Sequence, residues 1–209
     1  MKYILFIFIL TSVFSQTTAQ KSILLGPEIQ LRYNQFYLTQ GFDWLNSGVF
    51  RPALGLRVVV PLSESWKLCT GLQVALAGQN VYNATNTFTL GRMPFLIQWQ
   101  HPFQKEGKWS FLIRGGLTGE YLGKVTHRAN GSPTVVTNYT SPFLLSSTAE
   151  VGFSRKLSSG DEWVLTAGAD LGFWGSIPAY SSGSQGPAYQ MAAFYLSTLW
   201  LLKPSNFLK

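Results

Sequence analysis

Apolar and polar residues alternate with a period of two along most of the chain after residue 21. In residues 25–33, for example, Ile29, Leu31 and Tyr33 alternate with polar side chains. Successive side chains of a β-strand point to opposite faces, so this period predicts strands rather than helices. The pattern predicts six strands, at residues 25–33, 52–60, 66–76, 109–121, 145–153 and 163–173.

Two further segments, residues 87–99 and 189–202, are apolar on both faces in part. Their length and aromatic content still favour strands. Arg92 and Gln98 share one parity in the first segment, and Gln190 and Thr198 share one parity in the second. Pro94 lies in the middle of the first segment, where its missing backbone donor predicts a bulge or a local irregularity.

The connections between these eight strands alternate in length. The longer, polar ones are residues 34–50, 78–86, 122–141 and 175–187, and the shorter ones are residues 61–65, 101–108 and 155–162. Long outer loops and short periplasmic turns are typical of outer-membrane barrels. We therefore predict an all-β fold, an eight-stranded antiparallel up-and-down transmembrane β-barrel, formed by a single domain at residues 20–209.

The first residues have a different pattern and are expected to be outside this fold. Lys2 precedes an apolar run from Tyr3 to Phe14, and small residues follow up to Ala19. A short apolar run with this arrangement is typical of a secretory signal peptide, and it is shorter than the roughly 20 residues of a transmembrane helix. Residues 1–19 are predicted to be cleaved.

A secreted, soluble β-sandwich would also alternate, and three features favour the membrane barrel over it. The polar face is rich in small residues, which a narrow barrel interior requires. Aromatic residues lie at strand ends, as in interfacial girdles: Tyr33, Trp66, Trp99, Trp109, Tyr121, Trp163 and Phe173. The charges of the polar face balance, four against four: Glu28, Glu120, Glu150 and Asp170 against Arg32, Arg57, Arg92 and Arg114.

This balance predicts an interior salt-bridge network, because an unpaired buried charge costs several kcal/mol. Glu28 and Arg57 are at about the same height on neighbouring strands when counted from the short-turn end. Arg114 and Glu150 are likewise level. We expect these two pairs to form cross-strand salt bridges. Eight strands leave an interior that side chains just fill, which favours a plugged barrel over a pore.

The composition excludes several other classes of protein. Of the 209 residues only 12% are charged and 15% are aromatic, which excludes a disordered chain. The formal net charge is +7, but the basic residues do not cluster, so we expect no nucleic-acid binding. A single cysteine, Cys69, excludes an intramolecular disulfide and a cysteine-based zinc site.

Three segments resemble the small outer-membrane β-barrel proteins of Bacteroidetes-type bacteria, the family that includes PorT-like proteins. They are PLSESWKLCTGL from Pro61 to Leu72, MPFLI from Met93 to Ile97 and WSFLIRGGL from Trp109 to Leu117. The architecture is similar to that of OmpA-like and OmpX-like barrels. The resemblance implies a bacterial outer-membrane location. Some members of this group resemble subunits of secretion machinery, which implies an accessory role in such a complex.

Candidate catalytic chemistry is sparse. A lipid A-modifying hydrolase, the alternative enzyme function, would need a serine, a histidine and an acid near the outer leaflet. His101 falls in a predicted periplasmic turn, and His127 falls in the third outer loop without a nearby serine motif. No histidine or carboxylate cluster has metal-ligand spacing. We predict a non-enzymatic protein with no catalytic, metal or cofactor site.

The loops offer the remaining candidate surface. We define the candidate loop surface as Phe36, Tyr37, Phe42, Trp44 and Tyr139. Exposed aromatic residues on loops held by a rigid scaffold can bind a partner. Alternatively, they lie among lipid headgroups or pack over the barrel mouth. The partners we expect are outer-membrane lipid and another outer-membrane or periplasmic protein.

Overall fold

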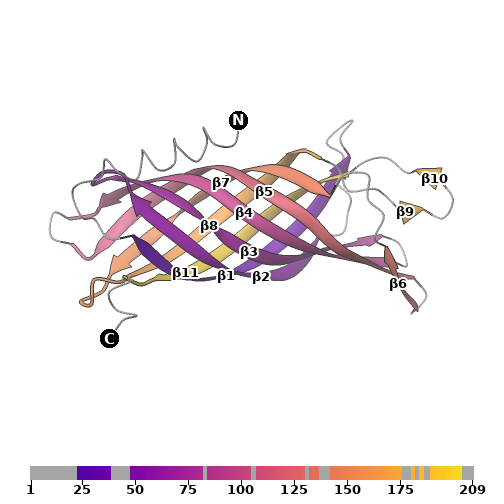
Figure 1. Ribbon diagram of the computed structural model, residues 1–209, viewed down its shortest axis with the longest axis horizontal. Coiled ribbons are helices and arrows are strands. Elements are labelled where there is room, and N and C mark those ends of the chain that lie inside the picture. The colour runs from indigo at the N-terminus through magenta and orange to yellow at the C-terminus, as the bar shows by residue number, and fades with distance from the viewer. Residues whose placement is uncertain are drawn as a thin grey trace, which may run out of the picture.

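The chain forms a closed, tilted β-barrel (Figure 1). The computed structural model describes residues 23–38, 48–81, 84–104, 107–129, 132–136, 142–175, 180–181, 184–185 and 189–203. The eight strands of the barrel wall are β1 (Leu24–Leu38), β2 (Val49–Pro61), β3 (Trp66–Val81), β4 (Ala84–Pro102), β5 (Trp109–Ala129), β7 (Phe143–Lys156), β8 (Glu162–Trp174) and β11 (Tyr189–Leu201). Three short strands lie at the loop end: β6 (Ser132–Val136), β9 (Tyr180–Ser181) and β10 (Ser184–Gln185).

Every wall strand pairs antiparallel with its neighbours in the chain, and β1 pairs with β11 to close the barrel. The predicted eight-stranded up-and-down barrel is therefore confirmed, and the β-sandwich alternative is wrong. The short turns lie together at one end of the barrel, here called the turn end. The longer connections and β6, β9 and β10 lie at the other end, here called the loop end (Figure 1).

Several strands are longer than the sequence pattern predicted. Residues 34–38, 78–81 and 122–129 belong to β1, β3 and β5, although the sequence pattern assigns them to loops. The β4–β5 ladder continues as far as Ala84 opposite Ala129, and β6 pairs with the upper part of β5. Backbone pairing continues in these extensions, although the apolar alternation that predicts the strand ends has already stopped.

Pro94 interrupts one ladder without changing its register. The β3–β4 pairing runs from Thr70 opposite Phe95 directly to Gln73 opposite Arg92, so two expected pairs are missing at the proline. This is the local irregularity expected from its missing donor. The register shift in β4 lies elsewhere, between Phe88 and Leu90 on the side of β5.

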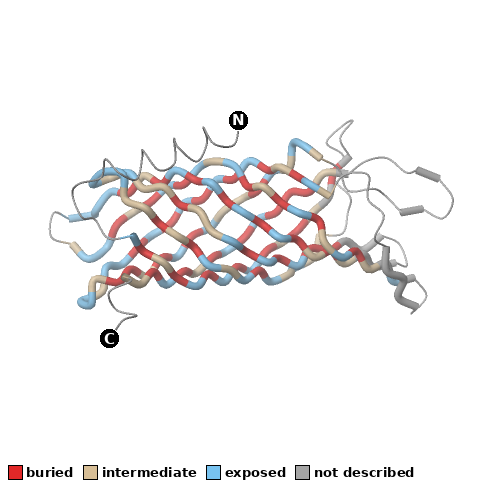
Figure 2. Tube along the Cα trace, viewed as in Figure 1, coloured by how far each residue is buried: buried red, intermediate tan, exposed pale blue. Residues whose placement is uncertain are grey.

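Burial alternates along the wall strands, as the red and blue segments of Figure 2 show. In β7, buried residues alternate with exposed ones over most of the strand. Among the described residues, no helix is long and apolar enough to cross a membrane. Residues 1–19, the predicted signal peptide, lie outside the described residues.

Candidate functional site

The charged residues predicted for the interior are all buried inside the barrel. Each of the eight is at most 3% exposed: Glu28, Arg32, Arg57, Arg92, Arg114, Glu120, Glu150 and Asp170. They come from six of the eight wall strands, and no strand contributes more than two of them. We call this set the interior charged layer.

Glu28 and Arg57 form a bidentate ion pair. The Nε and Nη2 atoms of Arg57 donate to the two carboxylate oxygens of Glu28, at 2.9 and 2.7 Å. Glu28 stands opposite Gly55 and Arg57 stands opposite Gly26, so the two side chains reach each other diagonally. A Cβ atom added to Gly26 would lie 1.6 Å from the backbone oxygen of Trp200 on β11, and one added to Gly55 would lie 2.5 Å from that of Leu72 on β3, so both glycines allow a close approach of neighbouring strands.

Arg114 and Glu150 stand directly opposite each other, with Nη1 of Arg114 2.8 Å from Oε2 of Glu150. The other oxygen of Glu150 lies 3.4 Å from Nη2 of Arg57 on β2. It also accepts a hydrogen bond of 3.0 Å from the Tyr195 hydroxyl on β11. These contacts span the lumen and connect β2, β5, β7 and β11.

The second part of the interior charged layer is centred on Asp170 of β8. One oxygen of Asp170 lies 2.6 Å from Nη2 of Arg32 and 2.5 Å from Nη2 of Arg92. Nε of Arg92 also lies 2.7 Å from Glu120 on the neighbouring strand. Asp170 therefore links β8 to β1 and β4 across the interior.

Uncharged polar residues complete the network, and charge counting could not have identified them. Gln73 donates to Glu28 at 2.6 Å and accepts from Arg92 at 2.8 Å, so it joins the two parts. Ser197 donates to Glu28 at 2.7 Å. The strand parity of β3 could have identified Gln73 as an inward residue. Ser197 could not have been identified in this way, because β11 is apolar on both faces. Of the two polar residues that share one parity in the predicted strand, Gln190 and Thr198, the latter has outward parity and accepts a hydrogen bond from Trp163.

Apolar clusters of buried residues lie on both sides of the interior charged layer. The cluster toward the loop end consists of Ala53, Ala75, Ala77, Phe88, Leu90, Leu122, Val125, Leu144 and Met191. The cluster toward the turn end consists of Leu24, Val59, Cys69, Leu96, Leu112, Val164, Leu199 and Leu201. Side chains therefore fill the barrel interior, as expected for eight strands.

The structure corrects one member of the candidate loop surface. Tyr37 belongs to β1 and its side chain is only 2% exposed. Its hydroxyl donates to the backbone oxygen of Gly172 and makes a second hydrogen bond to Gln190 at 2.9 Å. Tyr37 has the same parity as the exposed Ile29 and Leu31, but it is buried where β1 continues past the predicted strand end and its hydroxyl reaches β8 and β11. Phe42, Trp44, Tyr139 and the side chain of Phe36 lie outside the described residues.

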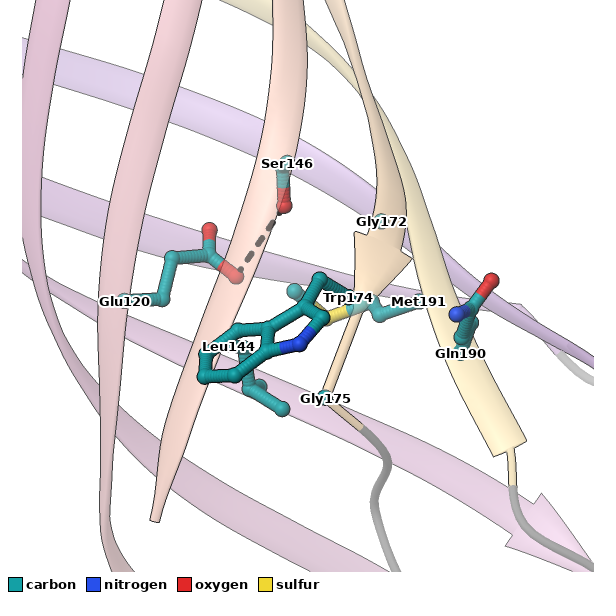
Figure 3. A pocket seen from close by; sticks show the side chains of 8 residues that line it. All are labelled: Glu120, Leu144, Ser146, Gly172, Trp174, Gly175, Gln190 and Met191. Atoms are coloured by element: carbon teal, nitrogen blue, oxygen red, sulfur yellow. Dashed lines mark hydrogen bonds between the residues drawn. The ribbon is translucent and has the colours of Figure 1, made fainter. Parts of the chain in front are cut away.

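A small hollow lies near Tyr37 at the loop end, lined by Glu120, Leu144, Ser146, Gly172, Trp174, Gly175, Gln190 and Met191. The Trp174 indole lies across it, and Ser146 donates a hydrogen bond to Glu120 beside it (Figure 3). The hollow has a volume of about 10 Å³, which is room for about one water molecule. It is too small for a substrate.

The outer face of the barrel is a continuous apolar band with aromatic residues at both margins. Leu54, Leu72 and Phe95 are among its many exposed side chains. Between Trp109 and Tyr121, at about 3.4 Å per residue and a tilt of about 40°, the wall rises by about 30 Å. That height equals the thickness of a bilayer hydrocarbon core, about 30 Å.

The two histidines weighed for catalysis belong to strand positions at opposite ends of the barrel. His101 lies at the turn end of β4 and stacks on Trp99, with ring centroids 5.7 Å apart. His127 lies in the loop-end extension of β5. The described residues contain no cluster of three histidine, cysteine or acidic side chains able to hold a metal.

Solved structures share this architecture at low sequence identity. The barrel is similar to Neisserial surface protein A (NspA), with a TM-score of 0.51 at 6% identity, covering 86% of this chain and 96% of that one. Ail of Yersinia pestis gives 0.44 at 9% identity, covering 88% and 100%, and OprG of Pseudomonas aeruginosa gives 0.46 at 10%, covering 86% and 93%.

No family model and no curated protein matches the sequence. The apolar outer face and the likeness to NspA together show the fold, which is that of a bacterial outer-membrane β-barrel.

Proposed function

We propose that this chain is an integral protein of the bacterial outer membrane with a non-enzymatic role, structural or in protein interaction. A filled barrel would hold the outer loops as a binding surface, or would serve as an accessory subunit of a secretion or transport complex. The kinship with PorT-like proteins of Bacteroidetes-type bacteria, and the cleaved signal peptide, are part of this proposal. The partners are outer-membrane lipid and another outer-membrane or periplasmic protein.

The observation that carries the proposal is the contrast between the two faces of the wall. Large apolar side chains cover the outside, while ion pairs and two apolar clusters fill the inside. A barrel of this kind is stable in a bilayer, and the interior formed by its described residues has no room for a substrate. The remaining surfaces for specific contact are its two ends.

Membrane fractionation tests the location. We expect the mature protein in the outer-membrane fraction, and we expect it to run faster on a denaturing gel when unboiled, because a closed barrel has no free strand edge at which to unzip. Recovery in the soluble periplasmic fraction would contradict the proposal.

Affinity purification from native membranes tests the interaction role. After gentle detergent extraction we expect a defined partner in a fixed ratio to the barrel. Expression should leave the mass of lipid A unchanged, and a change that requires the folded barrel would instead indicate an outer-leaflet enzyme.

A further inference from the structure

The turn end carries a row of aromatic residues interrupted by one arginine. Trp109 of β5 stands opposite Arg155 of β7, Arg155 stands opposite Trp163 of β8, and Trp163 stands opposite Trp200 of β11. These four residues lie side by side on four neighbouring strands. Arg155 has the same outward parity as the exposed Val151 and Phe153 of its strand. The guanidinium therefore belongs to the apolar outer face of the barrel.

The indoles next to Arg155 hold it in place. The Cζ atom of Arg155 lies 5.5 Å from the centre of the Trp109 ring, a cation–π contact. The ring centroids of Trp109 and Trp163 lie 6.3 Å apart at 81°. The indole nitrogen of Trp163 donates to Thr198 at 3.0 Å, which fixes that ring in turn.

Two more cations lie at this end of the barrel, at strand ends and with the parity opposite to that of Arg155, and they add to its positive charge. Lys156 follows it in the chain, and the backbone nitrogen of Lys156 donates to the backbone oxygen of Lys108 at 2.8 Å. All three side chains are exposed. None of them forms an ion pair within the described part of the chain.

The described acidic residues close to this cluster are directed to other partners. Glu162, opposite Lys156 on β8, lies 2.9 Å from Lys67 and accepts a hydrogen bond from Gln100. Asp161 accepts hydrogen bonds from Ser159 and from the backbone of Lys203. Within the described part of the chain, these three cations therefore have no acidic side chain as an ion-pair partner.

An arginine on the lipid face is destabilising at the bilayer midplane and tolerated near the interface. At the interface its nearest anions are lipid phosphates, which an arginine binds through two parallel hydrogen bonds. Phe153, two residues before Arg155, contacts Phe103 and Phe111, with ring centroids 5.9 Å apart in each case. These rings provide an apolar surface next to the cations, suited to an acyl chain.

We propose that Arg155, Lys156, Lys108 and the rings of Trp109 and Trp163 form a binding site for the phosphate headgroup of a phospholipid in the membrane leaflet at the turn end. This inference rests on the proposed membrane location. The guanidinium binds the phosphate, the lysines at the strand ends raise the local positive charge, and the aromatic surface contacts the acyl chain.

Native mass spectrometry of the folded barrel in nonionic detergent tests the site. The probes are phosphatidylglycerol and a diacylglycerol with the same acyl chains but no phosphate. We expect phosphatidylglycerol to be retained more strongly. Arg155→Gln should weaken its retention by about fivefold, the effect of one cation near a lipid surface. Arg155→Lys keeps the positive charge but lacks the planar guanidinium with its two parallel N–H donors, so it should have an intermediate effect.

Arg128→Gln is the matched control, because Arg128 is an exposed arginine at the loop end of β5. It should change retention by less than about twofold, since it removes the same charge far from the site. Equal losses in Arg155→Gln and Arg128→Gln, or equal retention of the two lipids, would overturn the proposal.

Heat modifiability on the gel establishes folding. If Arg155→Gln does not fold, the comparison uses Lys156→Gln, with the same expected and contradicting results. A chain that stays soluble without detergent would contradict the membrane location itself, whereas unchanged retention by an inserted barrel contradicts only the lipid site.

Discussion

The charged side chains inside the barrel are stabilised by several partners each. Glu28 accepts hydrogen bonds from Arg57, Gln30, Gln73 and Ser197, from both neighbouring strands and beyond. A buried ion pair adds little net stability over apolar residues of the same volume. Removing one partner of such a pair is costly, because the other charge stays buried. The interior charged layer therefore specifies which strands face each other.

A double-mutant cycle on Glu28 and Arg57 tests this coupling. Arg57→Met alone should lower the free energy of unfolding by about 3 kcal/mol, because Glu28 then lacks its cation. Arg57→Met combined with Glu28→Gln should cost less than the sum of the two single substitutions. Urea unfolding in detergent measures all four proteins. Additive losses would show that the pair is not coupled. Lys67→Met is a useful comparison, because Lys67 is partly exposed at the turn end and its loss should cost less.

The sequence predicted these charged residues more completely than their uncharged partners. Counting residues from the turn end placed Glu28 near Arg57 and Arg114 opposite Glu150, because the short turns fix the strand heights. It could not give the diagonal contact of the first pair or the contacts to Asp170 across the lumen, since these depend on barrel closure and side-chain reach. Tyr195 and Ser197 were missed because β11 is apolar on both faces, so its inward parity could not be read.

Strands approach one another closely where small residues face the interior. A Cβ atom added to Gly116 of β5 would lie 2.1 Å from the backbone oxygen of Phe95 on β4. A Cβ atom added to the preceding residue, Gly115, would meet nothing within 4 Å. The small residues predicted for the narrow interior are thus needed for strand packing at specific positions. The strand ends were less predictable, because hydrogen bonding extends β3, β4 and β5 beyond the apolar alternation.

The two neighbouring glycines provide a matched test of this packing. Gly116→Ala should lower the free energy of unfolding by about 1–3 kcal/mol, the usual cost of overpacking. Gly115→Ala should leave it unchanged or raise it by up to about 1 kcal/mol, because alanine loses less conformational entropy on folding. Urea unfolding of both variants in the same detergent decides the matter. Equal effects would show that the inward position is no more crowded than the outward one.

The whole molecule is a barrel whose outer face is apolar and whose interior is filled by side chains. Ion pairs between distant strands, such as Arg57 of β2 with Glu150 of β7, connect opposite parts of the wall. Apolar clusters lie on both sides of these charges, and at the turn end a chain of hydrogen bonds also leads from Arg114 through Gln98 and Gln100 to Glu162 and Lys67. These polar side chains are hydrogen-bonded to one another among the apolar clusters, which favours a plugged barrel over a pore. The barrel is then a rigid support, and its specific contacts with lipid or protein are made at its margins.

The single cysteine reports directly on whether water enters this interior. Cys69 is fully buried in the apolar cluster toward the turn end, with its sulfur 3.3 Å from Oε1 of Gln98. A water-soluble maleimide needs the solvated thiolate, so it should leave the folded barrel unmodified and label it fully after boiling. Mass spectrometry measures the labelled fraction.

The positive control is Glu64→Cys combined with Cys69→Ala, because Glu64 is exposed in the turn between β2 and β3. That variant should react while folded. Rapid labelling of Cys69 in the folded barrel would instead show a water-filled lumen, and the sealed interior would be wrong.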